Sequence, residues 1–316
     1  MISADEQPII GFYSAFDDPK IWENCIKEQL PKFRFEVLDR TLNRHLVKYA
    51  IVWSPPKGLL CEFPGLEAIF VIGAGVDSLL QDPDIPDVPI FRLTDAGMAY
   101  QMAHYVIYGV LHFQRKFSEY QQSQSVSEWQ PITDIVPPAN FGVGVLGLGA
   151  IGSVIASEIT RLGFSTKGWS TSIKKIKNVD TFCGDEGLDH VLQSSRVLVN
   201  VLPLTKDTKE IFSKDLFARL RPGTFLINIG RGQHVNEADL LSAIDANIVL
   251  GAMLDVFSVE PLPSSSLLWT NPRVLITPHT SGLTVPEEAM SQIISNIKLA
   301  ERQQIPLGEV DRGRGY

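Results

Sequence analysis

The sequence predicts an α/β protein with two doubly wound domains, each built on a mostly parallel sheet. Three observations support this class. Short apolar runs alternate with helical patterns along nearly all of the 316 residues. Several of these runs are apolar enough for strands buried on both faces. A glycine-rich turn also joins a strand to a helix near the middle of the chain.

The elements follow in chain order. Before the glycine turn, strands are expected at residues 8–13, 49–53 and 68–72, and helices at residues 19–30 and 99–120. After it, strands are expected at residues 196–202, 224–229, 249–256 and 274–277. Residues 236–239 start a helix. Thr284-Val285-Pro286-Glu287 matches a capping box with an early proline, which opens a helix to about residue 302.

The glycine turn carries the most information. The strand Val143-Gly144-Val145-Leu146 runs into Gly147-Leu148-Gly149-Ala150-Ile151-Gly152, and a helix and a second strand follow. This order within about thirty residues is typical of a dinucleotide-binding Rossmann unit. Gly147 permits the tight turn, Gly149 lets the backbone approach a pyrophosphate, and Gly152 lets the helix pack on the strand. The alternative is a glycine-bearing loop that binds nothing.

The central position of this unit predicts a discontinuous layout. Residues 1–99 and 283–316 would form a flavodoxin-like substrate domain. Residues 100–282 would form a Rossmann dinucleotide domain inserted into it. A second substrate is expected in the cleft between the two domains.

The residues after the second strand favour NADP(H) over NAD(H). A Rossmann unit for NAD usually has Asp or Glu there, about 20 residues past the glycines, to bind the ribose 2′-hydroxyl. This chain instead has hydroxyl and ammonium groups: Ser170, Thr171, Ser172, Lys174, Lys175 and Lys177. Such groups attract a 2′-phosphate, which a carboxylate would repel. The alternative is that the lysines lie on a solvated loop.

Composition argues against several other classes of protein. Hydrophobic residues make up 44% and charged residues 20%, as in soluble globular proteins, and the net charge of -8 disfavours nucleic acid as a partner. No apolar run is long enough to cross a membrane, and residues 1–8 are unlike a secretory signal. Cys25, Cys61 and Cys183 are scattered, which predicts buried, reduced thiols in a cytoplasmic protein and no metal site.

Three charged residues at the ends of predicted strands could act on a 2-oxo acid. Its reduction by a nicotinamide needs a cation for the carboxylate and ketone, an acid for the ketone oxygen, and a carboxylate that orients the acid. Arg231, His279 and Glu260 fit these requirements in that order. Ligands gather at the carboxyl ends of parallel strands. Taken singly, each residue has a simpler alternative as a turn cation, an unused histidine or a solvated carboxylate.

The order of these motifs resembles the D-2-hydroxyacid dehydrogenase family. Besides the glycine turn, the matching segments are residues 200–205, 228–232, 255–261 and 277–279. A narrower resemblance, to the glyoxylate/hydroxypyruvate reductase A branch, rests on residues 53–56, 101–102, 251–257 and 310–316. Two departures stand out. Thr171 and Ile173 replace arginines expected to hold the 2′-phosphate, and His104 replaces a glutamate.

The resemblance implies a role for each matched residue. Arg231 would bind the substrate carboxylate and carbonyl, His279 would donate a proton, and Glu260 would pair with His279 and favour its charged form. Asp255 would lie near the nicotinamide carboxamide. The substrate would also be bound by Trp53, Ala74 and Gly75. The remaining cofactor contacts would come from Leu202, Pro203, Thr208, Ile229, Gly230, Arg231, His279 and Gly282.

The sequence therefore predicts a cytoplasmic, homodimeric enzyme. It would use NADP(H) in preference to NAD(H) to reduce small 2-oxo acids, glyoxylate and hydroxypyruvate first, to D-2-hydroxy acids. Neither nucleic acid nor a membrane is expected as a partner. Two alternatives stay open: the same chemistry on a larger 2-oxo acid, and a dinucleotide-sensing binding protein without catalysis.

Overall fold

The structure, a computed structural model, describes residues 6–15, 17–39 and 41–316. It contains two compact units. The first runs to Gly97 and resumes at Thr284, and the second spans Met98–Leu283. The assignment of the first unit to substrate and of the second to dinucleotide stays a prediction. Residues 1–5, part of the segment that argued against a secretory signal, lie outside the described residues.

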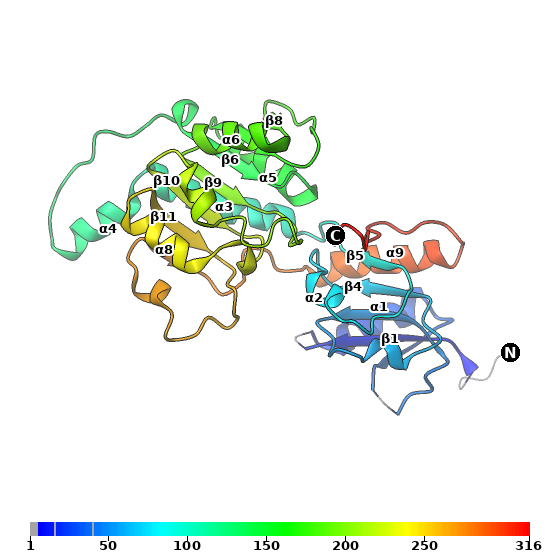
Figure 1. Ribbon diagram of the computed structural model, residues 1–316. Helices are drawn as coiled ribbons and strands as arrows, with labels where there is room; N and C mark the ends of the chain where they lie inside the picture. The colour runs from blue at the N-terminus through cyan, green and yellow to red at the C-terminus, as the bar shows by residue number, and fades with distance from the viewer. Residues whose placement is uncertain (1–5, 16, 40) are drawn as a thin grey trace. The chain divides into compact units, whose positions relative to one another are not determined.

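The first unit is a doubly wound parallel sheet in the order β2-β1-β3-β4-β5 (Figure 1). This is the flavodoxin-like order 2-1-3-4-5. Its strands are β1 (Ile9–Ser14), β2 (Arg34–Val37), β3 (Val47–Trp53), β4 (Ala68–Val71) and β5 (Ile90–Arg92). Its helices are α1 (Pro19–Gln29), the 3-10 helix η2 (Leu60–Glu62), α2 (Asp77–Leu80) and α9 (Pro286–Ala300). All of β4 and most of β3 are buried, as strands covered on both faces must be.

The second unit is a parallel sheet in the order β12-β11-β10-β9-β6-β7-β8. Counted from β6, this is the Rossmann order 3-2-1-4-5-6 with one further strand at the edge. Its strands are β6 (Gly142–Leu146), β7 (Ser165–Trp169), β8 (Asp180–Phe182), β9 (Val197–Asn200), β10 (Thr224–Asn228), β11 (Val249–Leu254) and β12 (Val274–Ile276). The strand order reverses between β6 and β9, where ligands bind in such sheets.

The helices of the second unit cover the sheet, apart from α4, which extends away from it and is followed by a long loop (Figure 1). The α-helices are α3 (Met98–Gln114), α4 (Phe117–Ser125), α5 (Ala150–Arg161), α6 (Gly184–Ser194), α7 (Lys214–Ala218) and α8 (Glu237–Asp245). The short 3-10 helices are η3 (Pro138–Asn140), η4 (Gly232–His234) and η5 (Leu267–Thr270). Asn236 caps α8 by accepting a hydrogen bond from Asp239 N at 3.1 Å, which confirms the predicted helix start.

Three sequence predictions were wrong. The single helix over residues 99–120 is two helices, because Lys116 adopts a left-handed conformation with φ of 57° that no continuous helix accommodates. The predicted capping box does not form: Val285 is the N-cap of α9 without a side-chain cap, although Pro286 is the first helical residue. The cysteines are free, as expected, but Cys61 and Cys183 are exposed rather than buried.

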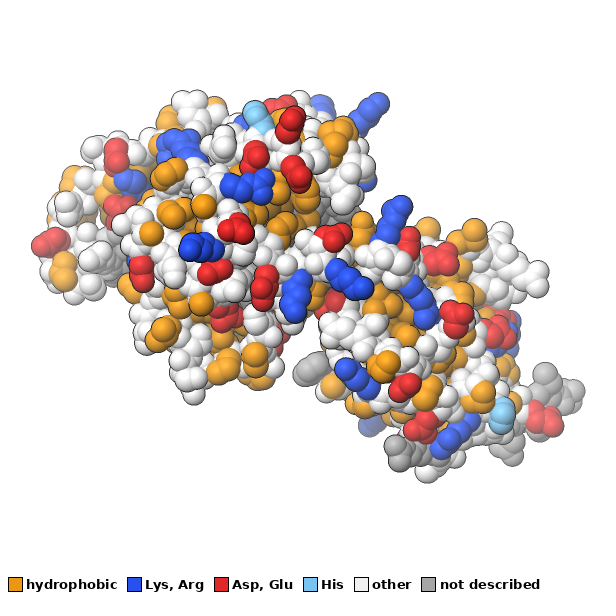
Figure 2. Space-filling model, viewed as in Figure 1, with side chains coloured by type: hydrophobic (Ala, Val, Ile, Leu, Met, Phe, Trp, Pro, Cys, Tyr) orange, Lys and Arg blue, Asp and Glu red, His pale blue; other side chains and the backbone are white. Residues whose placement is uncertain are grey.

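Three further features bear on function: membrane-spanning helices, metal ligands and the distribution of charge on the surface. No helix among the described residues is long and apolar enough to cross a membrane. In the same part of the chain, no group of three or more His, Cys, Asp and Glu side chains could hold a metal ion. On the face that Figure 2 shows, Lys and Arg side chains are interspersed with Asp and Glu and form no large basic area.

One carboxylate at the end of the C-terminal return makes several hydrogen bonds to the rest of the first unit. Glu301, just after α9, accepts hydrogen bonds from Lys48 Nζ at 2.8 Å and Tyr49 OH at 2.6 Å, and also from Lys32 Nζ. Burial alone would raise the pKa of Glu301, but these three donors and the charge of Lys48 lower it to about 2. The last helix is thereby bonded to β3 and to the loop before β2.

We expect Glu301→Gln to destabilise the protein at pH 7 by about 1–3 kcal/mol, because two ammonium groups and a phenol lose their anion. A folded-state pKa of about 2 against an ordinary 4.5 means that this stabilisation is complete above pH 4.5 and is lost as the pH falls through about 2. Urea unfolding measures the free energy of unfolding of the unmodified protein and of Glu301→Gln. The difference between the two should therefore be smaller at pH 3.5 than at pH 7. The control is Glu23→Gln, which breaks an exposed pair with Lys27 on α1 and should cost only a few tenths of a kcal/mol. An equal loss for both variants at pH 7 would contradict this account.

Candidate active site

The glycine turn between β6 and α5 has an open side and a packed side. Gly147 has φ of +104°, a conformation that favours glycine. A Cβ at Gly152 would lie 1.8 Å from the carbonyl oxygen of Gly147, whereas a Cβ at Gly149 would meet nothing within 4 Å. Gly152 is thus required for packing. Gly149 leaves the backbone free for the close approach of a ligand.

The start of α5 suits a phosphate group. Gly149 is the N-cap of this helix, and both Gly149 and Ala150 are exposed. The first N–H groups of a helix lack intrahelical partners and carry the positive end of its dipole. Leu148 is buried against Gly168 of β7. Backbone groups of Gly149 to Gly152 are therefore the groups that could hold a pyrophosphate.

The loop after β7 contains no carboxylate from Ser170 to Lys177. Ser170 is only 8% exposed, and its hydroxyl donates to the carbonyl oxygen of Ser172 at 2.8 Å. That hydrogen is therefore committed within the loop. The groups left to meet an anion are exposed side chains of the same loop: Thr171, Ser172, Lys174, Lys175 and Lys177. The residues predicted for the 2′-phosphate thus share one loop, but Ser170 differs from the others in orientation.

Arg231 lies in the loop after β10, where its peptide groups are fixed at both ends. Its N–H donates to Nδ1 of His234 at 3.0 Å, and its carbonyl accepts from the Asn228 side chain at 3.1 Å. A Cβ at the next residue, Gly232, would lie 1.8 Å from the carbonyl carbon of Phe257. The Arg231 loop is therefore pressed directly against the loop that follows β11.

Asp255 organises the turn after β12. The fully buried carboxylate accepts hydrogen bonds from the Thr277 hydroxyl at 2.6 Å, from Thr280 N at 2.8 Å and from Ser281 N at 2.9 Å. The backbone carbonyl oxygen of Asp255 accepts a hydrogen bond from His279 N at 2.8 Å. His279 itself has φ of 56°, a conformation that costs energy unless neighbouring contacts impose it. These four hydrogen bonds impose it.

The histidine and glutamate predicted to pair are in contact. Nδ1 of His279 lies 2.8 Å from Oε2 of Glu260, and the other Glu260 oxygen accepts from Phe257 N at 2.9 Å. Burial alone would raise the pKa of Glu260, but the hydrogen bonds from His279 and Phe257 and the positive charges of His279 and Arg231 hold it below its ordinary value. Glu260 is therefore ionised near neutral pH. The bond at Nδ1 leaves Nε2 as the ring nitrogen that can face a ligand, and the His279 side chain is 48% exposed.

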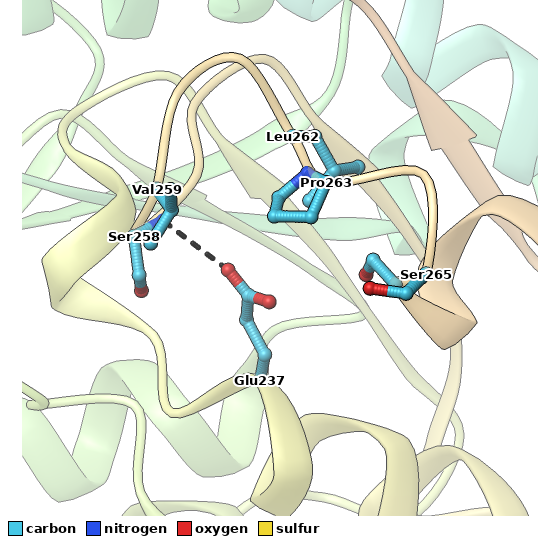
Figure 3. A pocket seen from close by; sticks show the side chains of 7 residues that line it. Glu237, Ser258, Val259, Leu262, Pro263 and Ser265 are labelled. Carbon is cyan, nitrogen blue, oxygen red and sulfur yellow. Dashed lines mark hydrogen bonds between the residues drawn. The ribbon is translucent and has the colours of Figure 1, made fainter.

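A pocket of about 210 Å³ lies beside the Glu260 loop, lined by Glu237, Ser258, Val259, Leu262, Pro263, Ser265 and Ser266 (Figure 3). Its one charged group, Glu237, points to the loop and accepts from Ser258 N at 3.2 Å. An anion there would repel an oxo acid. This contact anchors the loop that carries Glu260.

The other residues expected around the cofactor follow β9 and β10 or end the His279 turn. Leu202 and Ile229 are buried, and their backbone N–H groups donate to the side-chain oxygen and the carbonyl oxygen of Asn200 at 3.3 Å and 3.1 Å. Thr208 donates its hydroxyl to the carbonyl oxygen of Pro203 at 2.6 Å. Gly230 directly follows Ile229 in the loop after β10. Gly282 ends the His279 turn, and a Cβ there would lie 2.5 Å from the side chain of Met102.

The three residues expected to bind substrate from the first unit share the carboxyl edge of its sheet. Trp53 ends β3, and Ala74 and Gly75 follow β4. The indole ring of Trp53 covers Gly73, where a Cβ would lie 2.1 Å from the ring. Glycine at position 73 is thus needed for the tryptophan to occupy this edge.

Comparison with known proteins decides the family. The model of the D-isomer specific 2-hydroxyacid dehydrogenase NAD-binding domain matches residues 107–281. The chain belongs to this family. It is 40% identical to a glyoxylate/hydroxypyruvate reductase A of Photorhabdus laumondii, over 97% of this chain and 99% of that one. It is 41% identical to a protein of the same name from Klebsiella pneumoniae, over 98% and 99%.

Solved structures of this dehydrogenase family have the same fold. A Xanthobacter autotrophicus member in complex with NADPH and MES is 36% identical, with a TM-score of 0.93, over 98% of this chain and 100% of that one. An NADPH-dependent glyoxylate/hydroxypyruvate reductase of Sinorhizobium meliloti, in complex with NADP and sulfate, is 32% identical, with a TM-score of 0.89 and the same coverage.

Sequence reasoning about this dehydrogenase missed three buried polar residues. Asn200, Asn228 and His234 are fully buried and hydrogen-bonded to one another, with Asn200 Nδ2 lying 2.9 Å from both Asn228 Oδ1 and His234 Nδ1. Asn200 and Asn228 each end an apolar strand and begin a segment that resembles the family, but neither signal indicated a contact between them. Nothing local distinguished His234 from the other histidines.

The two glycines separate ligand binding from packing. We expect Gly149→Ala to fold normally, since its Cβ meets open space, but to raise the Kd for NADPH by about tenfold or more, because the methyl group occupies the pyrophosphate approach. Gly152→Ala should instead lower Tm by about 2–10 °C through overpacking. Fluorescence titration with NADPH and thermal unfolding measure the two effects. Unchanged NADPH binding in Gly149→Ala would place the pyrophosphate elsewhere.

Proposed function

We propose that this protein reduces small 2-oxo acids, glyoxylate and hydroxypyruvate, to D-2-hydroxy acids with NADPH. The observation that carries the proposal is the contact between His279 and an ionised Glu260. Both lie at the carboxyl edge of the sheet that also presents Arg231 and the glycine turn. Each of these four features follows a parallel strand, so all of them emerge at one edge. The names of the relatives agree with this chemistry.

The chain's own residues account for recognition and proton transfer. When bound, the nicotinamide supplies the hydride. Arg231 holds the substrate carboxylate and polarises the ketone, since a guanidinium offers parallel N–H donors. His279 donates the Nε2 proton to the ketone oxygen as negative charge develops there. Glu260 keeps Nδ1 protonated and fixes the ring, so that the imidazole can deliver this proton.

The substrate is expected to be small. The bulky indole of Trp53 occupies the edge of the first unit's sheet next to Ala74 and Gly75. The N–H groups of Ala74 and Gly75 are proposed to bind the substrate carboxylate, with Trp53 as the wall that limits the rest of the molecule. This feature favours glyoxylate and hydroxypyruvate over larger 2-oxo acids.

The pH dependence tests the His279–Glu260 pair. Because the pKa of Glu260 lies below its ordinary 4.5, the glutamate stays ionised throughout assays above pH 5. Glu260→Gln removes this charge, so the alkaline fall of kcat/KM for reduction should move down by about one pH unit. His279→Ala should lose about 10²–10⁴ in rate at pH values below the alkaline fall of the unmodified enzyme. An unmoved alkaline limb in Glu260→Gln would remove Glu260 from the proton-transfer step.

Cofactor choice is proposed to favour NADPH. The exposed groups after Ser170 are hydroxyls and lysines, and no carboxylate stands between residues 170 and 177. We expect kcat/KM with NADPH to exceed that with NADH by about tenfold, equivalent to about 1.4 kcal/mol. Ser170→Asp should reverse the preference by repelling the 2′-phosphate. Ser170→Ala, which loses the hydroxyl without adding charge, should retain it. Equal efficiencies with both cofactors in the unmodified enzyme would refute this proposal.

The protein is proposed to be a homodimer that acts in the cytoplasm. The α4 segment, residues 117–129, supports self-association: α4 contains no buried residue, and the Trp129 side chain is 98% exposed. Exposed aromatic residues on an extended arm are typical of an interaction surface, and two-fold assembly of identical chains is the commonest kind.

The oligomeric state can be tested at this arm. Trp129→Ser should shift the protein toward monomer by at least tenfold in dimer Kd, since a buried tryptophan contributes about 1.4 kcal/mol or more to an interface. The control is Trp269→Ser, because Trp269 is 51% exposed on η5, away from the arm in sequence. Light scattering after size exclusion measures the mass. A monomeric unmodified protein would rule out the dimer.

A further inference from the structure

His234 is a buried histidine with no part in the proton transfer proposed above. It ends η4, and its side chain is fully buried. Nδ1 lies 3.0 Å from the backbone nitrogen of Arg231 and 2.9 Å from Nδ2 of Asn200, and Nε2 lies 3.2 Å from the carbonyl oxygen of Pro203. Both ring nitrogens thus have partners, as buried polar atoms require.

The partners determine which nitrogen carries the hydrogen. The Arg231 backbone N–H and the Asn200 amide group are donors, so Nδ1 must accept. The Pro203 carbonyl is an acceptor, so Nε2 must donate. Only the neutral imidazole with its hydrogen on Nε2 satisfies all three contacts. His234 is therefore a directional connector, with an acceptor on one side and a donor on the other.

The two sides of the ring lead to two different loops. The Arg231 loop, residues 229–232, carries the guanidinium proposed to hold the substrate carboxylate. The Pro203 loop, residues 201–208, carries groups proposed to contact the cofactor, and its Pro203 carbonyl also accepts from Thr208. One buried ring thus holds the backbone of both loops.

We infer that His234 is a positioning residue that sets the Arg231 loop through Nδ1 and the Pro203 loop through Nε2. The inference deepens the proposed function, since it rests on the role proposed for Arg231 in holding the substrate and on the cofactor contacts expected from Leu202, Pro203 and Thr208. A histidine that merely fills the core would act on both loops together through stability. If His234 instead acts on each loop through a different ring nitrogen, a substitution that removes one contact should affect one loop more than the other.

Two substitutions preserve one side each. Asparagine places its amide oxygen near the position of Nδ1 but does not reach Pro203. Glutamine places its amide near Nε2 and loses the acceptor for Arg231. We expect His234→Asn to raise the Kd for NADPH by about three- to tenfold while glyoxylate binding to the NADP⁺ complex stays within about twofold. His234→Gln should raise the Kd for glyoxylate by about three- to tenfold and that for NADPH by less, because the Arg231 loop also carries the expected cofactor contacts Ile229 and Gly230.

Both dissociation constants are measured by calorimetry and neither needs turnover. A failure of the proposed reaction, seen as NADPH binding without glyoxylate reduction, is thus distinct from a failure of this inference. Thermal unfolding of each variant accompanies the titrations. If both variants weaken both ligands equally and in proportion to their loss of Tm, His234 is a core residue and the inference is overturned.

A measurement on the unmodified protein covers the case in which a variant does not fold. Long-range ¹H–¹⁵N spectra of histidine-labelled protein distinguish the two neutral tautomers, and His→Gln variants at the other five histidines assign His234 by elimination. The expected result is a neutral ring with its hydrogen on Nε2. A hydrogen on Nδ1 would be incompatible with the Arg231 contact and would overturn the inference.

Discussion

The buried carboxylate of Asp255 is the constraint on which the carboxyl edge of the second unit's sheet depends. It accepts three hydrogen bonds from the turn after β12, and the carbonyl oxygen of the same residue accepts a fourth from His279. A buried carboxylate without such donors would be costly. The same bonds hold His279 in its left-handed conformation. Asp255 therefore links β11 to β12 and sets where the imidazole can point.

The parallel sheet brings segments that are distant in the sequence together at one edge. The loops after β6, β9, β10, β11 and β12 all leave the carboxyl edge, and each is fixed by polar contacts to a neighbour. Asn200 and Asn228 bond across the ends of β9 and β10. Gly232 allows the Arg231 loop to touch the backbone of Phe257. Hydrogen bonds among buried polar groups rigidify such an edge because an unpaired member would carry its full desolvation cost.

Much of this arrangement was predictable because its signals are local. Continuous apolar runs located most of the strands near the site, and the glycine spacing predicted the turn that the structure shows. The resemblance implied the Glu260–His279 contact. The break at Lys116 was not predictable, since no proline or glycine marks it. The strands β2, β5 and β8 were missed because each is short and includes a charged residue, whereas the equally short β4, β9 and β12 lie in apolar runs. The partners of His234 and Asp255 depend on strand register, which local sequence does not encode.

The function proposed for this edge is hydride transfer to a small 2-oxo acid, and not the binding of a dinucleotide alone. The most direct test is a single-turnover reaction of the protein with one equivalent of NADPH and excess hydroxypyruvate, with the chirality of the product determined. We expect NADPH to be consumed in a one-to-one ratio with the D-glycerate formed. Tight binding of NADPH without its oxidation, or formation of L-glycerate, would contradict it.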